Sequence, residues 1–421
     1  MEEKRIAENG IPVYSLINEN SHGFFISMFL KAGCMYEGES ENGITHFLEH
    51  AAIRNVNKLM GGTLYRELDR YGIDFNASTY AEMVQFYISG SAVHFRRAAE
   101  IISKLLSPVE LDTSELDAER NRIKAEIREG GDKTTLAFAA GEEVWQGTPL
   151  ARSITGTLGS VSGITKTKLE NYRQRIFNKD NIFFYVTGNV NNDNLSYLTE
   201  LIGAYKVSGS EIHDNIAMVP DGFMNRPKKV KIKNADFTKI RYSFDVDMSK
   251  VTNAELDLLY DIVLGGYNSD FFIELSEKRG LFYDLGGTLE RYRNIAVFSF
   301  SYELKESHLY EATEMTVELL KGYTERLLDT DRCMKAAYVD NAYMLFDNPS
   351  DLSFTFGYDN HVLGLGYRNI DERSEAYRRV TPKRLCEVAK TVFQPKNLTV
   401  TLKANKKKID AEKLEKIIFG E

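Results

Sequence analysis

Five consecutive residues, His46-Phe47-Leu48-Glu49-His50, place three chemically capable side chains next to one another. His46 and His50 are four residues apart, so on a helix their imidazoles project from one face and can bind one metal ion. Glu49 follows His46 at a spacing of three, close enough for its carboxylate to act on a water molecule at that metal. The alternative is a pair of histidines on a solvated helix face, and a third ligand is needed to decide between these interpretations.

A second predicted helix supplies acidic side chains at a suitable spacing. Its start is predicted at Asp112, because Asp112 and Glu115 match a capping box, and its end at Gly130. Glu119 and Glu126 on this helix are seven residues apart, which is two turns, so they share a face. From the residues alone, a solvated helix with Glu–Arg and Glu–Lys pairs remains the favoured interpretation of either glutamate.

Further residues around these two helices recur together in one known family. They are Gly43 with the following Ile-Thr, Asn76-Ala77 on a predicted strand, Gly147-Thr148-Pro149, Gly156-Thr157, and the segment from Asn181 to Gly188. Together with H-x-x-E-H, the order found in inverted zincins, they make residues 10–191 resemble the pitrilysin/insulinase-type metallopeptidases. The resemblance is strongest to the short-chain branch of that family, which includes the mitochondrial processing peptidases.

The resemblance implies one zinc ion in this chain, bound by His46, His50 and Glu126. In the family the third ligand is a glutamate 76 residues after the second histidine, and this position is Glu126. Glu49 would be the general base of a hydrolysis that uses a metal-activated water. A helper glutamate seven residues before the third ligand corresponds to Glu119, which would orient a ligand histidine.

The resemblance also implies a substrate site. The segment around Asn76 and Ala77 corresponds to a sheet edge to which the peptide adds as an extra strand. The alternative is that these two residues merely begin a strand. In the second half of the chain Tyr283 matches a substrate-binding tyrosine, but Ser276 stands where the family has a substrate-clamping arginine. Arg279 lies three residues later than that arginine.

The chain is predicted to be an internal duplication. Four residue types recur at one offset of 216, in the pairs Thr165 and Thr381, Leu169 and Leu385, Phe177 and Phe393, and Asn181 and Asn397. We therefore predict an N-terminal zinc domain at 1–210 and a homologous C-terminal domain at 228–421. Pro and Gly residues place the linker at 207–227. With this offset, residues 262–266 correspond in the repeat to His46–His50. They include no metal-binding side chain, so the C-terminal domain is predicted to lack metal ligands.

Hydrophobic periodicity predicts strands and long helices in both halves. The predicted elements of the first half are strands 11–17, 24–31 and 84–89 and helices 43–58, 94–106 and 114–129. In the second half, strands are predicted at 230–233, 240–246 and 297–304. Each half is therefore predicted to be an α+β domain, a mixed sheet covered by helices. In the family that the chain resembles, two such domains form half of a clamshell chamber.

Composition and charge disfavour several classes of protein. The 421 residues are 43% hydrophobic and 27% charged, as in ordinary globular enzymes, and the formal net charge of −8 argues against a nucleic-acid partner. No apolar run reaches the ~20 residues needed to span a bilayer, and no secretory or transit segment is visible after Met1. Cys34, Cys333 and Cys386 lack metal-ligand spacing and fit a reducing compartment. A cytoplasmic protein without membrane association is expected.

The sequence thus predicts a zinc-dependent endopeptidase that hydrolyses peptides or unfolded segments. The alternative is a non-hydrolytic scaffold or assembly subunit of the same fold, although such a protein would have no use for the base Glu49. Because Ser276 replaces the clamping arginine, we expect a heterodimer with a homologous subunit that lacks the zinc motif and supplies this arginine. A homodimer is the alternative.

Overall fold

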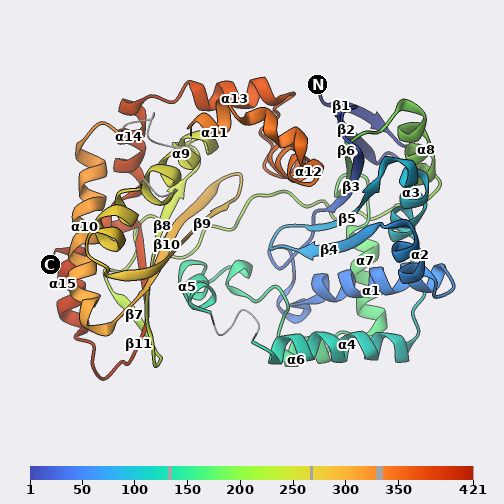
Figure 1. Ribbon diagram of the computed structural model, residues 1–421. Helices are drawn as coiled ribbons and strands as arrows, with labels where there is room; N and C mark the ends of the chain where they lie inside the picture. The colour runs from blue at the N-terminus through green and yellow to red at the C-terminus, as the bar shows by residue number, and fades with distance from the viewer. Residues whose placement is uncertain (131–134, 266–268, 329–334, 421) are drawn as a thin grey trace. The chain divides into compact units, whose positions relative to one another are not determined.

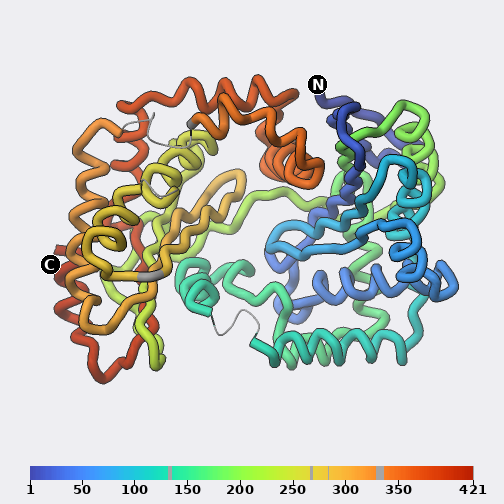
Figure 2. The backbone as a smooth tube through the Cα atoms, viewed as in Figure 1, coloured from blue at the N-terminus to red at the C-terminus, as the bar shows by residue number. Residues whose placement is uncertain are grey.

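The computed structural model describes residues 1–130, 135–265, 269–328 and 335–420. The chain divides into two compact units, whose elements are drawn in Figure 1 and whose backbone is traced in Figure 2. Unit 1 consists of Met1–Asp132, Arg152–Asn215 and Tyr343–Asn369, and unit 2 of Lys133–Ala151, Ile216–Ala342 and Ile370–Glu421. Among the described residues, no helix is both long enough and apolar enough to cross a membrane.

Unit 1 is built on a mixed sheet with the strand order β1-β2-β6-β3-β5-β4. Its strands are β1 (Glu3–Ile6), β2 (Pro12–Ile17), β3 (Gly23–Leu30), β4 (Asp74–Thr79), β5 (Val84–Ser91) and β6 (Ile182–Gly188). β2 and β6 pair in parallel, whereas the other neighbours are antiparallel. β4 ends the sheet, so within the described residues its outer edge has no partner strand.

The helices of unit 1 lie on both faces of this sheet. They are α1 (Ile44–Leu59), α2 (Leu64–Tyr71), α3 (Phe95–Ser103), α4 (Thr113–Arg128), α6 (Leu158–Ser162), α7 (Lys166–Ile176), α8 (Asn192–Gly203) and α12 (Pro349–Phe356). Residues of α1, α3, α7 and α8 share one hydrophobic core with the strands. α12 contacts β3 and β6 of the same sheet, and the π-helix η9 (Gly357–Val362) follows it directly.

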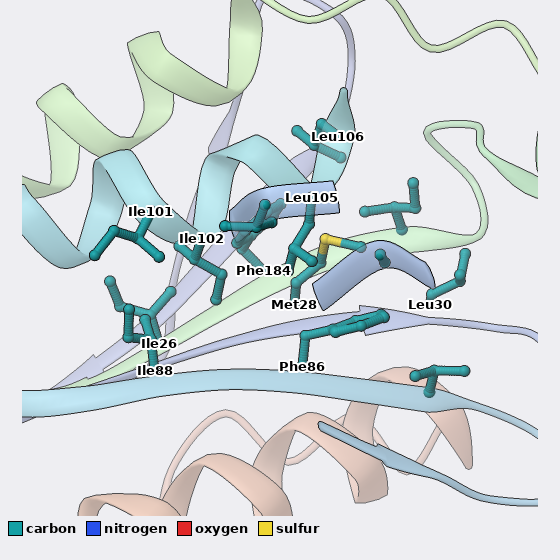
Figure 3. Packing of buried hydrophobic residues seen from close by; sticks show 14 of the residues in the cluster. Ile26, Met28, Leu30, Phe86, Ile88, Ile101, Ile102, Leu105, Leu106 and Phe184 are labelled. Atoms are coloured by element: carbon teal, nitrogen blue, oxygen red, sulfur yellow. The ribbon is translucent and has the colours of Figure 1, made fainter. Parts of the chain in front are cut away.

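Figure 3 shows how this core is built from alternating strand residues and one helix face. Ile26 on β3 and Ile88 on β5 are cross-strand partners, and both point towards Ile101 and Ile102 of α3. All four side chains are fully buried. Burial of each stabilises the fold by roughly 1.5–3 kcal/mol. The period-2 pattern of the strands and the helical pattern of residues 95–103 therefore meet in one apolar layer.

Unit 2 repeats this architecture with the strand order β7-β11-β8-β10-β9. Its strands are β7 (Val230–Asn234), β8 (Thr238–Asp247), β9 (Phe282–Arg291), β10 (Ile295–Leu304) and β11 (Leu398–Ala404). Its helices are α5 (Leu136–Val144), α9 (Asn253–Leu264), the π-helix η6 (Phe272–Glu277), α10 (Leu309–Glu325), α11 (Lys335–Val339), α13 (Ile370–Arg378), α14 (Pro382–Val392) and α15 (Ala411–Phe419). β7 and β11 are parallel and the remaining pairs antiparallel. The predicted α+β class is confirmed in both units.

Two segments depart from a simple division of the chain into halves. α5, from the first half of the sequence, contacts β8 and β11 of unit 2, and α12, from the second half, contacts β3 and β6 of unit 1. The predicted boundary at 207–227 follows the sequence repeat, so it would assign α5 to the N-terminal domain and α12 to the C-terminal domain. In each unit a helix from the other half of the sequence covers the sheet, and in unit 2 the strands that α5 contacts alternate core residues with buried polar ones such as Ser243 and Thr401.

The predicted offset of 216 holds for some elements only. It relates Lys166, the first residue of α7, to Pro382 of α14, and Ile182 of β6 to Leu398 of β11. α9, however, begins at Asn253 rather than at residue 260, because the connection 248–252 is shorter than the connection 31–43 that precedes α1. Residues 262–264 therefore end α9 instead of matching the turn with H-x-x-E-H, and the predicted counterpart at 262–266 does not hold. Gly266 lies outside the described residues.

Candidate metal centre

A buried carboxylate fixes the start of α1. Gly43, which precedes the helix, has a φ of +88°, and a Cβ at this position would lie 2.8 Å from the Cα of Gly156. The backbone N–H groups of Gly43 and Thr45 donate to Glu37 at 2.8 and 2.9 Å. Burial raises the pKa of Glu37, although these hydrogen bonds oppose the rise. Glu37 thus satisfies free N–H groups at the start of α1, the turn that carries His46.

The structure brings the three predicted metal ligands together. His46 Nε2 lies 3.8 Å from Glu126 Oε1, and His50 Nε2 lies 3.7 Å from Glu126 Oε2. One ligand atom from each residue lies within 4.8 Å of the others, and no second such group of His, Cys, Asp or Glu occurs in the part of the chain that the structure describes. α1 supplies both histidines from one face, and the neighbouring α4 supplies the glutamate (Figure 1).

Glu119 determines the tautomer of His50. Its Oε2 lies 3.2 Å from His50 Nδ1, and because an ionised carboxylate only accepts, Nδ1 donates and Nε2 keeps its lone pair. Arg54 donates to the other oxygen of Glu119 at 2.7 Å. Burial favours a higher pKa for Glu119, but the hydrogen bonds from His50 and Arg54 outweigh burial and hold this pKa below its usual range. Glu119 is therefore ionised and orients His50 towards Glu126.

His46 is in the protonation state that a metal ion requires. Burial, and after it the neighbouring His50, lowers the pKa of His46 to about 4, so its imidazole is neutral at neutral pH. Its Nδ1 is buried and has no hydrogen-bond partner among the residues that the structure describes. The ring position of His46 therefore depends on packing, whereas that of His50 depends on Glu119.

The donor set fits a zinc ion. Two imidazoles and one carboxylate form a common set of protein ligands in catalytic zinc sites, where the fourth position is left for water. At bond lengths of about 2.1 Å, tetrahedral ligand atoms lie roughly 3.4 Å apart. The Glu126 oxygens lie 3.8 Å from His46 Nε2 and 3.7 Å from His50 Nε2, and one ligand atom from each residue lies within 4.8 Å of the others, so a bound ion would draw these side chains closer together. The Glu126 side chain is about half exposed and has room for such a shift.

The predicted base Glu49 is hydrogen-bonded to the edge strand of the sheet. Its side chain is buried and accepts a hydrogen bond from Thr79, the last residue of β4. The contact of Thr79 with Glu49 was not predicted from the sequence, and neither was Arg54 as the second partner of Glu119. For Arg54 a signal existed, since it follows His50 by four residues and so shares its helix face. For Thr79 the only signal was its place at the end of the strand that contains Asn76.

A cavity of about 700 Å³ lies beside the candidate metal ligands. Its lining includes Glu49 and His50 from α1 and Phe75 and Asn76 from β4. Ala77, the other predicted substrate residue of this strand, is half-buried against the core. The structure thus places Asn76 and Ala77 on the sheet edge that adjoins the metal centre.

The substrate residues predicted in the second half lie in unit 2. Tyr283 belongs to β9, and its side chain lies outside the described part of the structure. Ser276, at the place of the family's arginine, is in the π-helix η6 and donates to the carbonyl oxygen of Phe282 at 3.4 Å. Arg279 forms an exposed ion pair with Glu311 at 3.3 Å. Arg279 is thus paired with a carboxylate of its own unit.

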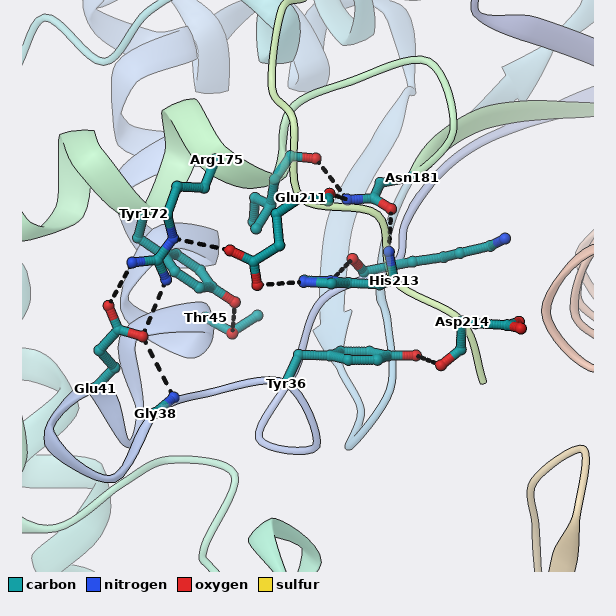
Figure 4. Close-up of polar contacts among 12 residues, drawn as sticks. Tyr36, Gly38, Glu41, Thr45, Tyr172, Arg175, Asn181, Glu211, His213 and Asp214 are labelled. Carbon is teal, nitrogen blue, oxygen red and sulfur yellow. Dashed lines mark hydrogen bonds and ion pairs between the residues drawn. The ribbon is translucent and has the colours of Figure 1, made fainter. Parts of the chain in front are cut away.

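A polar network that was not predicted holds the loop before α1 (Figure 4). Arg175 on α7 binds both carboxylate oxygens of Glu41 at 2.9 and 3.0 Å and Glu211 at 3.0 Å. The hydroxyl of Tyr172, also on α7, lies 2.7 Å from Thr45 Oγ1 in the first turn of α1. α7 therefore fixes the helix that carries the candidate metal ligands His46 and His50, and bidentate Arg–carboxylate contacts make this support directional.

Comparison with known proteins gives two successive family matches. Residues 13–158 match the family described as insulinase (peptidase family M16), and residues 163–341 match the family described as the peptidase M16 inactive domain. An "uncharacterized zinc protease" of Rickettsia felis is 25% identical over 296 residues, which cover 69% of this chain and 71% of that protein. Both halves of the chain are therefore related to peptidases of this kind.

Two mitochondrial proteins match a shorter part of the chain. The mitochondrial-processing peptidase subunit beta of Caenorhabditis elegans is 27% identical over 191 residues, which cover 44% of this chain and 42% of that protein. The cytochrome b-c1 complex subunit 1 of Mus musculus is 26% identical over 198 residues, which cover 46% of this chain and 41% of that protein.

A solved structure shares the whole fold. The crystal structure of a protease from Helicobacter pylori superposes with a TM-score of 0.80 and 19% sequence identity, covering 96% of this chain and 99% of that one. At this identity the likeness supports the fold alone. The two family matches together show that this chain belongs to the insulinase family of peptidases, peptidase family M16.

Proposed function

We propose that this chain is a zinc-dependent endopeptidase that hydrolyses peptides or unfolded protein segments, with one zinc ion per chain. One observation carries the proposal. Ligand atoms of His46, His50 and Glu126 lie within 4.8 Å of one another, and the carboxylate of Glu49 is on the residue next to His50. Membership of the family supports the proposal, because a relative is named a zinc protease.

Each side chain would have a distinct role. A bound zinc ion would lower the pKa of a water molecule towards neutrality. Glu49 would accept a proton from this water as the water attacks the scissile carbonyl, and would return the proton to the departing amine. Thr79 holds the carboxylate of Glu49 by its hydrogen bond. Glu119 keeps His50 in the tautomer that leaves Nε2 unprotonated, so it positions a ligand instead of reacting.

The substrate would add as an extra strand along β4. The outer edge of β4 carries backbone N–H and C=O groups that no described strand pairs with, and such an edge accepts an extended peptide. Asn76 and Ala77 lie on this strand, and the adjoining cavity reaches Glu49. Backbone pairing selects for extended conformation, which suits unfolded segments better than folded proteins.

The second candidate function is that of a non-hydrolytic scaffold or assembly subunit. The relationship to a protein named as a subunit of the cytochrome b-c1 complex favours it. The side chains of this chain weigh against it, because a scaffold needs neither the base Glu49 nor the hydrogen bond that Thr79 donates to it.

Metal analysis combined with a cleavage assay separates the two functions. Elemental mass spectrometry of the purified chain should find about one zinc ion per chain. A panel of internally quenched peptides, assayed with and without a homologous partner, should be cleaved, and a chelator should stop the cleavage. A chain that binds no zinc and cleaves nothing in either preparation would be a scaffold.

We further propose that the enzyme works in the cytoplasm as a heterodimer with a homologous subunit that lacks H-x-x-E-H. Ser276 motivates this proposal, because a serine hydroxyl cannot form the planar two-point contact of an arginine, and here it bonds to Phe282. Relatives named as subunits agree with assembly in general. A homodimer is the alternative.

A further inference from the structure

The residues of β4 alternate between two faces of the sheet. Phe75 and Ala77 pack against the core on the side of α1, and Thr79 donates to Glu49 on that side. Asn76 and Ser78 point to the opposite face, where they are the cross-strand partners of Tyr87 and Gln85 on β5. A peptide strand paired with β4 would alternate in the same way, because side chains opposite one another lie on the same face.

The opposite face holds a second cavity. It has a volume of about 470 Å³ and lies between the β4 edge and α12. Ser78 and Tyr80 line it at the edge of the sheet, Phe25 and Tyr87 form its floor with rings stacked at 5.2 Å, and Phe354 of α12 lines its far side. The Phe354 and Tyr80 rings lie 5.9 Å apart. Four aromatic rings thus line the cavity, together with Leu345 and polar residues that include Gln85, Ser350 and Asp351.

The wall that α12 contributes is anchored to the sheet. Ser353 Oγ lies 3.0 Å from Ser27 Oγ on β3, and Thr187 on β6 donates to the carbonyl oxygen of Pro349 at 2.6 Å. Tyr358, one turn beyond Phe354, donates to Glu82 at 2.8 Å. These contacts fix the wall of the cavity within unit 1. That wall comes from the second half of the sequence.

We propose that this aromatic cavity is a specificity site for an apolar or aromatic side chain of the substrate, on the face of the sheet opposite to the candidate metal centre. The inference rests on the proposed addition of the peptide to β4. A residue of the bound strand opposite Ser78 enters the aromatic cavity, and its two neighbours in the bound strand face α1 and Glu49. The preferred substrate is an extended peptide with a large apolar residue at a fixed distance from the scissile bond.

The chemistry of the two cavities distinguishes their occupants. The cavity next to Glu49 is lined by charged groups, among them Arg54, Lys58 and Arg122, besides Tyr65. Desolvating these charges would cost free energy if an apolar side chain filled that cavity. The cavity beside Phe354 has one charged lining residue, Asp351, and it presents ring faces on which an aromatic side chain can stack in offset or edge-to-face geometry.

The test uses peptides whose background of small polar residues offers no large apolar side chain. Fluorescein-labelled decapeptides of alternating Ser and Thr carry a single Phe, which is moved through every internal position. With the zinc-loaded chain, mass spectrometry should show cleavage at one constant spacing from the Phe. With the chelator-treated chain, fluorescence anisotropy should show about tenfold tighter binding of Phe peptides than of the parent without Phe.

Two variants of α12 should remove both effects. Phe354→Ala deletes the far wall, and Thr355→Trp fills the cavity from the same helix. Each should scatter the cleavage positions and lower the affinity for Phe peptides to that of the parent peptide. Tyr343→Ala is the matched control, because it removes an exposed aromatic ring of the same segment that does not line the cavity.

The outcomes distinguish this inference from the proposed hydrolysis. Binding that depends on Phe and on Phe354, without cleavage, would support the cavity and contradict the peptidase function. The inference is overturned if both α12 variants behave like the parent chain. It is also overturned if Tyr65→Ala, in the cavity beside Glu49, removes the constant spacing instead.

Discussion

Thr79, the last residue of β4, donates a hydrogen bond to the carboxylate of Glu49 on α1. A hydrogen bond therefore joins the residue proposed as the base to the strand proposed to receive the peptide. A peptide paired with β4 would lie against the same strand that orients the base. This arrangement couples substrate position to the direction in which the carboxylate points, and such orientation contributes to the rate of proton transfer.

Replacing Thr79 by valine should lower kcat without removing the metal. Valine keeps the shape of the side chain but donates no hydrogen bond, and a bond to a charged group contributes enough for a roughly tenfold loss. Thr79→Ser, which retains the hydroxyl, should stay close to the parent. Steady-state kinetics and zinc content measured on the same samples provide the check, and equal kcat for the valine and serine variants would contradict the role of this hydrogen bond.

Glu49→Gln should retain zinc and lose hydrolysis. The amide cannot accept a proton from the attacking water, whereas His46, His50 and Glu126 are unchanged, so we expect a loss of at least about a hundredfold in kcat. The measurement is cleavage of a quenched peptide together with the zinc content of the variant. Activity near that of the parent would show that another group serves as the base.

Glu126→Gln should lose metal affinity and activity together. An amide is a poorer zinc ligand than a carboxylate, and the structure places Glu126 within 4 Å of both histidine Nε2 atoms. Glu129→Gln is the matched control, because this residue caps α4 and is not part of the ligand group. Titration with a competing chelator measures the affinity, and a larger effect at position 129 than at 126 would refute the ligand assignment.

Asp261→Asn should stabilise the protein more at pH 8 than at pH 5. Burial, opposed by a hydrogen bond with Tyr338 and assisted by Asp257, raises the pKa of Asp261 to about 7, and its Oδ2 has no partner among the described residues. Between pH 4 and 7 the folded state keeps a proton that the unfolded chain releases, so stability falls as the pH rises. The substitution should remove a penalty of about 1–3 kcal/mol at pH 8. Thermal unfolding at the two pH values provides the measurement, and equal shifts would argue against this titration.

The isolated chain should be a weak peptidase. If the arginine missing at Ser276 is supplied by a partner, turnover of a diverse peptide panel should rise strongly when a homologous subunit without H-x-x-E-H is added. Sedimentation analysis of the chain alone, carried out in parallel, tests for the homodimer. Full turnover by the isolated monomer would refute the borrowing of the arginine.

The sequence by itself determined the local part of the metal centre. The spacing of four between His46 and His50 and of seven between Glu119 and Glu126 translates into shared helix faces, because helical periodicity depends only on neighbouring residues. The capping box at Asp112 likewise predicted where α4 begins, and the structure confirms it. The proposed roles of Glu126 as zinc ligand and Glu49 as base could be named only through the family resemblance, since spacing does not say which of several glutamates faces a histidine.

Only the tertiary structure decided the contacts between distant segments. That Glu119 holds His50 and that Thr79 holds Glu49 depends on how α4 and β4 lie against α1, and packing of that kind leaves no periodic signal in the sequence. The exchange of α5 and α12 between the units was equally hidden, because helical periodicity shows which face of a helix is apolar but not which sheet that face covers. Which sheet it covers is decided by long-range complementarity, and with it whether a cavity forms beside Phe354.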